Sequence, residues 1–220
     1  MALSDKEILR YKKLGNIVIE PFEKENLATS SYDVSLGEWY FREQRQNFDI
    51  YNPYDKNQTD KVWGTKPHKA ELAKNVLKDF EFKGIKPGDK IILISPGETI
   101  LAHTEQFVGG RREITTMMKA RSSMGRNFIE VCKCAGWGDV GFFNRWTMEI
   151  TNNSRFYTIP LVVGRRIAQI VFFYVGPVLK NDYAHKGKYQ NTTTFSKMKK
   201  EWSPLSMLPK LYKDREIQKK

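Results

Sequence analysis

The chain has 220 residues, of which 40% are hydrophobic and 13% aromatic, a composition that suits one globular domain and excludes a disordered chain. No apolar run approaches the ~18 residues that a membrane-spanning helix needs, and residues 1–15 lack the apolar core of a secretion signal. The formal net charge is +12, and residues 180–220 alone hold eleven Lys/Arg against four Asp/Glu.

Residues 1–41 predict one helix and two strands. Ser4 and Glu7 form a capping-box pattern, which indicates a short helix within the first fifteen residues. Residues 16–22 predict a strand that stops at Pro21. Residues 31–41 alternate between apolar and polar side chains, which predicts a second strand, and Gly37 marks a bulge or turn within it.

Residues 52–67 are polar and contain Pro and Gly, so we expect a loop. Residues 68–80 predict one short helix, with an apolar face made of Leu72, Val76, Leu77 and Phe80. The tail from Asn181 onward is polar and has little periodicity. We expect it to be disordered, or ordered only when something binds.

Many short strands follow one another at a spacing of about ten residues, which favours an all-β barrel or sandwich. Pro-Gly pairs at 87–88 and 96–97 and the Gly-Gly pair at 109–110 separate the earlier ones. The predicted strands are 80–84, 89–95, 98–104, 112–120, 128–134, 145–151, 156–162 and 165–176.

The basic tail has three interpretations. A solvated charged segment is the simplest, a rim that steers anionic substrates is the second, and nucleic-acid binding is the third. We therefore expect neither a nucleic-acid nor a membrane partner.

The two cysteines, Cys132 and Cys134, lie two apart on a predicted strand, so they share a face and are poorly placed to bridge each other. This cysteine use favours a reducing, cytoplasmic compartment. The three histidines are scattered along the chain and no C-x-x-C pattern accompanies them, so we expect no zinc site.

Residues 121–126, Arg-Ser-Ser-Met-Gly-Arg, form a compact candidate anion site after an apolar strand. Two hydroxyls, the amides around Gly125 and two guanidinium groups are all groups that bind phosphate. Arginine suits phosphate because its fork is planar and permanently charged. An ordinary surface turn is the alternative, and these residues alone leave both open.

Residues 134–142 carry three glycines within six residues, which allows a tight turn and a close approach of another group to the backbone. Asp139 in this loop could accept a sugar hydroxyl or could merely cap amides. Glu149 follows on a predicted strand, on the same face as Thr147 and opposite Met148. A surface position is commoner for a glutamate, but a pocket would raise its pKa and suit it to shuttle a proton.

In their order along the chain, these segments resemble the dCTP deaminase family, the deaminase branch of the trimeric dUTPase-like fold. The resemblance covers most of the chain. Residues 3–22, 30–40 and 87–108 look like the family's first helix and strand, its Asp-containing strand and its Pro-Gly hairpin. KARSSMGR, AGWGDVGFFNRWTMEITN, GRRIAQIVFF and KYQN look like the nucleotide motif, the catalytic loop and strand, the Gln-containing strand and the start of the tail motif.

The resemblance implies a mainly β fold, a distorted dUTPase-like β-barrel with a short N-terminal helix and a few minor helices. Residues 1–178 would form this domain, and residues 179–220 a basic tail whose first part is an active-site lid. The chain would be a homotrimer with active sites between subunits. It would be a hydrolase that converts dCTP to dUTP and ammonia, with Mg²⁺ on the substrate phosphates, no zinc, and dTTP as a feedback inhibitor.

The resemblance also implies residue roles. Glu149 would move a proton from a water to N3 of cytosine, while Ser122 and the carbonyl of Ala135 hold that water and Arg126 offsets developing charge. Asp139 would accept the 3′-hydroxyl, and Arg121 of a neighbouring subunit would help to bind the phosphates. The expected nucleotide-binding set is Arg121, Ser122, Ser123, Met124, Gly125, Arg126, Trp137, Asp139, Thr147, Met148, Glu149, Tyr183, Lys188 and Gln190.

The chain departs from the family pattern in two places. The tail glutamine of the family falls at Thr192, where Gln190 is the expected substitute, and a family glycine is replaced by Asn144. Two enzymatic alternatives therefore stay open, a bifunctional enzyme that takes dCTP to dUMP and a dUTP pyrophosphatase. A third alternative is a non-catalytic nucleic-acid-binding protein on the same fold.

Overall fold

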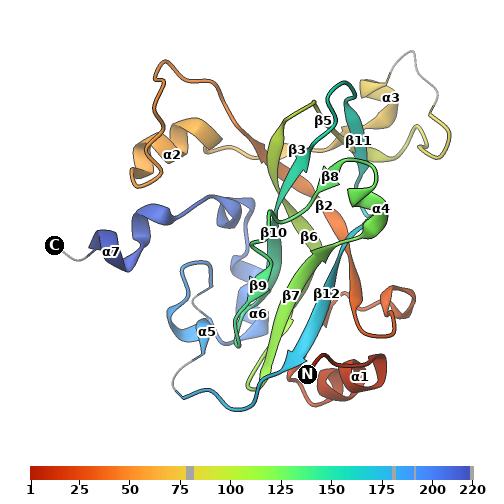
Figure 1. The fold of residues 1–220 in the computed structure, drawn as a ribbon, viewed down its shortest axis with the longest axis vertical. Helices are drawn as coiled ribbons and strands as arrows, with labels where there is room; N and C mark the ends of the chain where they lie inside the picture. The colour runs from red at the N-terminus through yellow and green to blue at the C-terminus, as the bar shows by residue number, and fades with distance from the viewer. Residues whose placement is uncertain (78–81, 180–181, 191, 219–220) are drawn as a thin grey trace.

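The computed structural model describes residues 1–77, 82–179, 182–190 and 192–218, and antiparallel strands dominate it (Figure 1). One nine-stranded sheet contains β8-β10-β6-β2-β12-β7-β9 in that order, with β1 and β3 paired at its side. Its strands are β1 (Ile17–Glu20), β2 (Tyr32–Arg42), β3 (His68–Lys69), β6 (Thr99–Gly110), β7 (Ile114–Ala120), β8 (Ile129–Glu130), β9 (Trp137–Gly138), β10 (Phe143–Asn152) and β12 (Arg166–Tyr174). A second sheet joins β11 (Ile159–Val162), β5 (Lys90–Ile94) and β4 (Glu71–Leu72).

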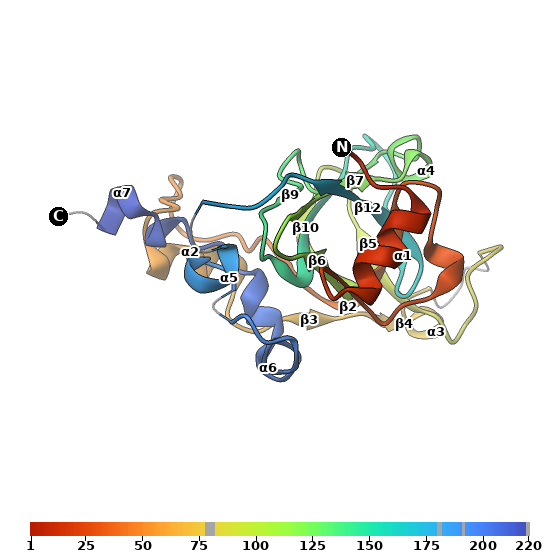
Figure 2. The same cartoon turned by 90° about the horizontal axis from the view of Figure 1, so that it is seen from below.

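The large sheet curls around a shared interior, as the view from below shows (Figure 2). Side chains from most strands fill this interior with one apolar core, which includes Tyr32, Ile94, Ile114, Met148 and Phe172. The expected mainly β, barrel-like fold is therefore confirmed. No helix within the described residues is long and apolar enough to cross a membrane.

The first helix, α1 (Asp5–Lys13), begins where the capping pattern predicts. The Ser4 hydroxyl accepts a hydrogen bond from the Glu7 N–H at 3.4 Å, which satisfies one of the free donors of the first turn. The Glu7 carboxylate, however, pairs with Arg10 at 2.6 Å, one turn further on. Short 3-10 and α turns follow at η1 (Lys24–Asn26) and α4 (Ser122–Gly125).

Most predicted strands are confirmed, and so is the bulge at Gly37. The pairing of β2 with β6 shifts between Leu36 and Tyr40. A Cβ at Gly37 would lie 2.0 Å from Cε1 of His103, so only glycine lets the two strands approach here.

Two predictions for residues 52–80 are wrong. The expected loop contains α2 (Lys56–Trp63), whose N-cap Asp55 accepts a hydrogen bond from the Asn57 N–H at 2.8 Å. The expected helix of 68–80 is instead β3, β4 and the single turn α3 (Ala73–Val76). Residues 82–84 of the expected strand are not in a strand, and Phe80 lies outside the described residues.

Gly109 and Gly110 do not separate strands but end β6 itself. A Cβ at Gly109 would lie 1.9 Å from the Phe142 carbonyl oxygen, so this pair allows backbones to touch. The strand expected at 128–134 ends at Glu130, because Cys132, Lys133 and Cys134 all have positive φ (66°, 37° and 62°).

The tail is folded in the described residues, so disorder, the first of its two expected states, is wrong, and order that depends on binding stays a prediction. It forms α5 (Tyr183–Lys186), α6 (Phe195–Glu201), η2 (Pro204–Met207), η3 (Leu211–Lys213) and α7 (Arg215–Gln218). Both views show it beside the barrel, on the side where α2 also lies (Figures 1 and 2). Two small apolar clusters attach it, one around Phe107, Phe143 and Met198 and one around Phe41, Leu101 and Met207.

Candidate functional site

Strand β10 turns Glu149 and Thr147 to one face and Met148 and Ile150 to the other, as predicted from the alternation. Met148 and Ile150 are fully buried in the core, so the side chain of Met148 is not available to a ligand. Glu149 lies opposite Leu101 of β6 in the strand register. The carboxylate is therefore held on a strand that pairs with β6 rather than on a loop.

Glu149 lines a cavity of about 490 Å³ between the barrel, α2 and the tail. A cavity of this size is typical of small-molecule sites. The barrel side is lined by Leu101, Ala135, Trp137, Gly138, Asp139, Phe142, Asn144, Arg145, Trp146, Thr147 and Glu149. The remaining wall comes from Trp63 of α2 and from Tyr183, Tyr189, Ser206, Met207 and Pro209 of the tail.

Burial raises the pKa of the Glu149 carboxyl above its usual range, and the charge of Lys133 opposes this only in part. A carboxyl whose pKa is shifted toward neutrality is suited to take up and release a proton. Raised pKa values of this kind occur at functional sites more often than elsewhere.

A strained turn lies beside Glu149. The N–H of Cys132 donates a hydrogen bond to the Glu149 carbonyl at 3.1 Å, and the N–H of Ala135 donates to the Cys132 carbonyl at 2.6 Å. Three consecutive residues with left-handed φ are unusual for side chains other than glycine, and such strain is concentrated at functional sites. The turn delivers Ala135 to the cavity.

The prediction that the two cysteines of this turn share one face of a strand is wrong, because the chain there is not a strand. Cys132 is buried, Cys134 is exposed, and both are free thiols. Burial raises the pKa of Cys132 to about 11, which keeps this thiol protonated and unreactive.

The glycine-rich loop packs its own backbone against β7. The hydroxyls of Thr115 and Thr116 donate to the Gly138 carbonyl at 2.7 and 3.3 Å. A Cβ at Gly138 would lie 2.4 Å from Oγ1 of Thr116, so the glycine is needed for this approach. The loop leaves Asp139 exposed at the cavity, while the Trp137 ring stacks on Phe173 with centroids 6.3 Å apart.

The tail docks on the segment Phe142-Phe143-Asn144, where the sequence departs from the family pattern. The Tyr183 ring meets Phe142 edge-on with centroids 5.5 Å apart. The Asn144 side-chain amide donates to the Tyr189 carbonyl at 3.3 Å. Asn144 therefore fastens the tail over the cavity.

Lys188 and Gln190 do not line the cavity. The Lys188 ammonium pairs with the Asp214 carboxylate of the tail. Gln190 is buried, and its amide accepts from the Phe143 N–H at 2.9 Å and donates to the Gly141 carbonyl at 2.8 Å. The Gln190 side chain thus holds the tail on the glycine-rich loop and does not face the cavity.

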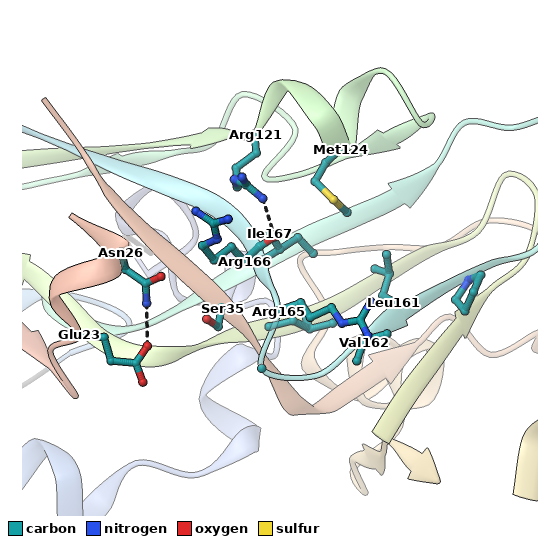
Figure 3. A pocket seen from close by; sticks show the side chains of 13 residues that line it. Glu23, Asn26, Ser35, Arg121, Met124, Leu161, Val162, Arg165, Arg166 and Ile167 are labelled. Atoms are coloured by element: carbon teal, nitrogen blue, oxygen red, sulfur yellow. Dashed lines mark hydrogen bonds between the residues drawn. The ribbon is translucent and has the colours of Figure 1, made fainter. Parts of the chain in front are cut away.

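The Arg-Ser-Ser turn lies apart from this cavity. Ser122, Ser123 and Arg126 are exposed on and after α4, as is Gly125, and none of them lines the cavity of Glu149. Arg121 and Met124 line a second cavity of about 540 Å³, together with Arg165 and Arg166 (Figure 3). One chain therefore brings Ala135, Asp139 and Glu149 together but leaves Ser122 and Arg126 elsewhere.

One carboxylate pairs with two arginines of the second cavity. Asp33 pairs with Arg166 at 2.9 Å and with Arg121 at 3.5 Å, and Arg121 also donates to the Arg166 carbonyl at 3.3 Å. These contacts hold both arginines on one carboxylate while their side chains stay partly exposed. The result is a cluster of basic side chains that adjoins, in the chain, the two serines of α4.

Several cavity residues escaped the sequence analysis. A local signal for Arg145 is its place two residues before Thr147 and four before Glu149 on the same strand. Nothing local could have placed Trp63 or Met207, because they reach the cavity through long-range packing of α2 and the tail. Within the described residues no group of three or more His, Cys, Asp or Glu side chains could hold a metal ion.

Known proteins resemble this chain in sequence and in fold. Residues 2–175 match the sequence model of the family described as dCTP deaminase-like. The chain is 36% identical to "dCTP deaminase, dUMP-forming" of Hydrogenobaculum sp., over 78% of this chain and 81% of that protein. It is 32% identical to the protein of the same name from Methanosphaera stadtmanae, over 91% of this chain and 95% of that protein.

A solved structure supports the fold. The 2′-deoxycytidine 5′-triphosphate deaminase from Agrobacterium tumefaciens superimposes with a TM-score of 0.54 at 15% identity, covering 82% of this chain and 50% of that one.

Proposed function

Because the chain belongs to the dCTP deaminase-like family, we propose that it hydrolyses dCTP to dUMP, ammonia and pyrophosphate. Two waters are consumed, one at C4 of the base and one at the α-phosphate. The dUMP product follows the names of the relatives. The observation that carries the proposal is the half-buried Glu149 carboxylate, whose pKa is raised by burial, at the wall of a nucleotide-sized cavity.

In the deamination step, Glu149 takes a proton from a water and passes it to N3 of cytosine. The resulting hydroxide attacks C4, and ammonia leaves. The carbonyl of Ala135 orients the water from the strained turn. Asp139 accepts the sugar 3′-hydroxyl, and Trp137 and Thr147 border the nucleoside. These roles are supported by the fact that all five residues line one cavity.

A second copy of the chain completes the site. Ser122, Ser123 and Arg126 are exposed and away from the Glu149 cavity of their own chain, so a neighbouring subunit delivers them in a homotrimer. The neighbour's Ser122 then holds the attacking water, and its Arg121 and Arg126 bind phosphate and offset developing charge. This arrangement explains why one chain carries its candidate residues on two separate surfaces.

The triphosphate brings Mg²⁺, which offsets the phosphate charge. Phosphate oxygens fit this role because only two carboxylates, Asp139 and Glu149, line the cavity within the described residues, and Mg²⁺ at such sites is held largely by substrate phosphates and water.

The direct test is to incubate the purified protein with dCTP and Mg²⁺ and to resolve the products. Equal amounts of dUMP, pyrophosphate and ammonia are expected. Accumulation of dUTP with ammonia would instead support the narrower deaminase, which is the second candidate because Glu149 alone accounts for it. Absence of dUMP, dUTP and ammonia would overturn both, and added dTTP tests inhibition in the same assay.

The interface is tested by mixing two inactive variants. Glu149→Gln and Ser122→Ala each remove one half of a composite site. Co-refolded mixtures should recover part of the activity, since some interfaces then pair an intact Glu149 with an intact Ser122. Mixtures that stay as inactive as the separate variants would refute the shared site.

A further inference from the structure

Arg145 is the only basic side chain that lines the Glu149 cavity within the described residues. It lies on β10, four residues before Glu149, and the pairing of β10 with β6 shifts between Arg145 and Thr147. The two acidic side chains of the same lining, Asp139 and Glu149, would repel an anionic ligand. A nucleotide that enters this cavity therefore finds one cation supplied by the same chain.

The guanidinium of Arg145 has no hydrogen-bond or ion-pair partner in the described part of the chain, and its Nε is buried. Glu105 and Glu38 act on it only through their fields, and Glu38 already pairs with Lys90 at 2.6 Å. A half-buried cation without an anionic partner is unfavourable. A ligand anion would remove that penalty.

Aromatic rings hold Arg145 in place. Its guanidinium carbon lies 5.0 Å from the Phe107 ring centroid and 4.5 Å from that of Trp202. Trp202 belongs to the tail and also packs on His103, with ring centroids 4.8 Å apart. Such cation–π contacts fix the position of the group without using its N–H donors.

We propose that Arg145 is a phosphate-binding residue of the cavity, whose free terminal N–H groups donate to the phosphate chain of the nucleotide. This assignment rests on the proposed function and adds to it a cation from the chain that supplies Glu149. It is independent of the arginines that a neighbouring subunit would bring. The tail segment at Trp202 thereby acquires a role in holding a ligand-binding group.

Arg111 provides a matched control. Its Nε is also buried without a partner, and its guanidinium also stacks on a ring, 4.0 Å from the Phe143 centroid. It likewise reaches the tail, at the Thr193 carbonyl. Arg111 does not line the cavity, so its loss reports what a structural arginine at the tail contributes.

The experiment measures equilibrium binding of deoxycytidine, dCMP, dCDP and dCTP with Mg²⁺ to full-length protein that carries Glu149→Gln. Adding Arg145→Gln should leave deoxycytidine binding unchanged. It should weaken at least one nucleotide roughly ten- to hundredfold, as expected for a lost hydrogen bond to a charged group. Adding Arg111→Gln should change none of the four. The shortest nucleotide whose binding is weakened identifies which phosphate, α, β or γ, Arg145 contacts.

Equal affinities of the Arg145→Gln protein and its parent for all nucleotides would overturn the assignment. So would an equal loss for deoxycytidine and dCTP, which indicates a merely structural role. If Arg145→Gln does not fold, Arg145→Lys keeps the charge and shortens the reach, and the same comparison applies. Failure of the proposed function is distinct, because wild-type protein would then not turn over dCTP at all.

Discussion

The N–H of Cys132 donates a hydrogen bond to the backbone carbonyl of Glu149 at 3.1 Å. This bond joins the strained turn of residues 132–134 to strand β10 at the candidate catalytic position. A second bond, from the Ala135 N–H to the Cys132 carbonyl at 2.6 Å, ties Ala135 at the end of that turn to the same backbone. Both residues proposed to act on the water, Ala135 and Glu149, line one cavity.

Replacement of Glu149 by Gln should lower kcat by about 10²–10⁴-fold, the usual contribution of a general acid–base group. The amide keeps the size of the side chain but cannot carry a proton between water and base, so KM for dCTP should change little. Steady-state ammonia release measures both. Glu130→Gln, on β8 and outside the cavity lining, is the control and should keep wild-type kcat. A Glu149→Gln enzyme with near-normal kcat would remove Glu149 as the proton shuttle.

The same variant has a stability signature. The pKa of Glu149 is raised in the folded state by burial, above its ordinary value of 4.5. At low pH the Glu149 carboxyl is protonated in both the folded and the unfolded chain, so its burial does not lower the folding stability. As pH rises through 4.5 toward the folded pKa, only the unfolded chain ionises freely, so folding stability is lost.

Glu149→Gln should therefore be more stable than wild type at pH 7, and the difference should vanish below about pH 4. Denaturant unfolding at several pH values measures it. A constant difference across the whole range would contradict a raised pKa.

The strands and the face of Glu149 could be predicted because both depend on local alternation, which a strand preserves wherever it packs. The ordered motifs likewise indicated the family. The glycine pair at 109–110 was wrongly predicted to separate two strands. Glycine occurs both in turns and where two backbones touch, and only the position of Phe142 decides between them. The turn at Cys132 has no glycine to signal its left-handed backbone.

The remaining wall of the cavity could not be predicted because it depends on distant pairs. Helix α2 has little apolar periodicity, and it is held by Trp63 in the cluster that contains Met207. The tail looked featureless for the same reason, since its apolar side chains are few and each meets a partner far away in sequence. Lys188 and Gln190 were expected at the ligand, but Asp214 and the backbone of residues 141–143 bind them instead.

Gln190 offers a test of tail docking. Replacement by Met keeps the volume but leaves the Phe143 N–H and the Gly141 carbonyl without their buried partner. The free energy of unfolding should fall by about 1–3 kcal/mol, and KM should rise because Tyr183 and Tyr189 lose their anchor. Gln218→Met, at an exposed site near the end of the chain, should stay within about 0.5 kcal/mol of wild type. Denaturant unfolding and limited proteolysis measure the effect, and equal behaviour of the two variants would contradict it.

Gly109→Ala tests the close approach of β6 to the segment that carries Phe142. The new Cβ would lie 1.9 Å from the Phe142 carbonyl oxygen and 2.6 Å from Cα of Phe143. Backbone on both sides must therefore move, at a cost of about 1–3 kcal/mol of stability or more. Because the Phe142 N–H donates to the Asp139 carbonyl at 3.0 Å, the shift should displace Asp139 and lower kcat/KM for dCTP.

Gly88→Ala is the matched control, since a Cβ there meets nothing within 4 Å. It should remain within about 0.5 kcal/mol of wild type and keep full activity. Thermal or denaturant unfolding of both variants, with dCTP turnover alongside, makes the comparison. If Gly109→Ala matches Gly88→Ala in both measurements, β6 and the Phe142 segment are not in the close contact that shapes the cavity, and the glycine pair has no part in placing Asp139.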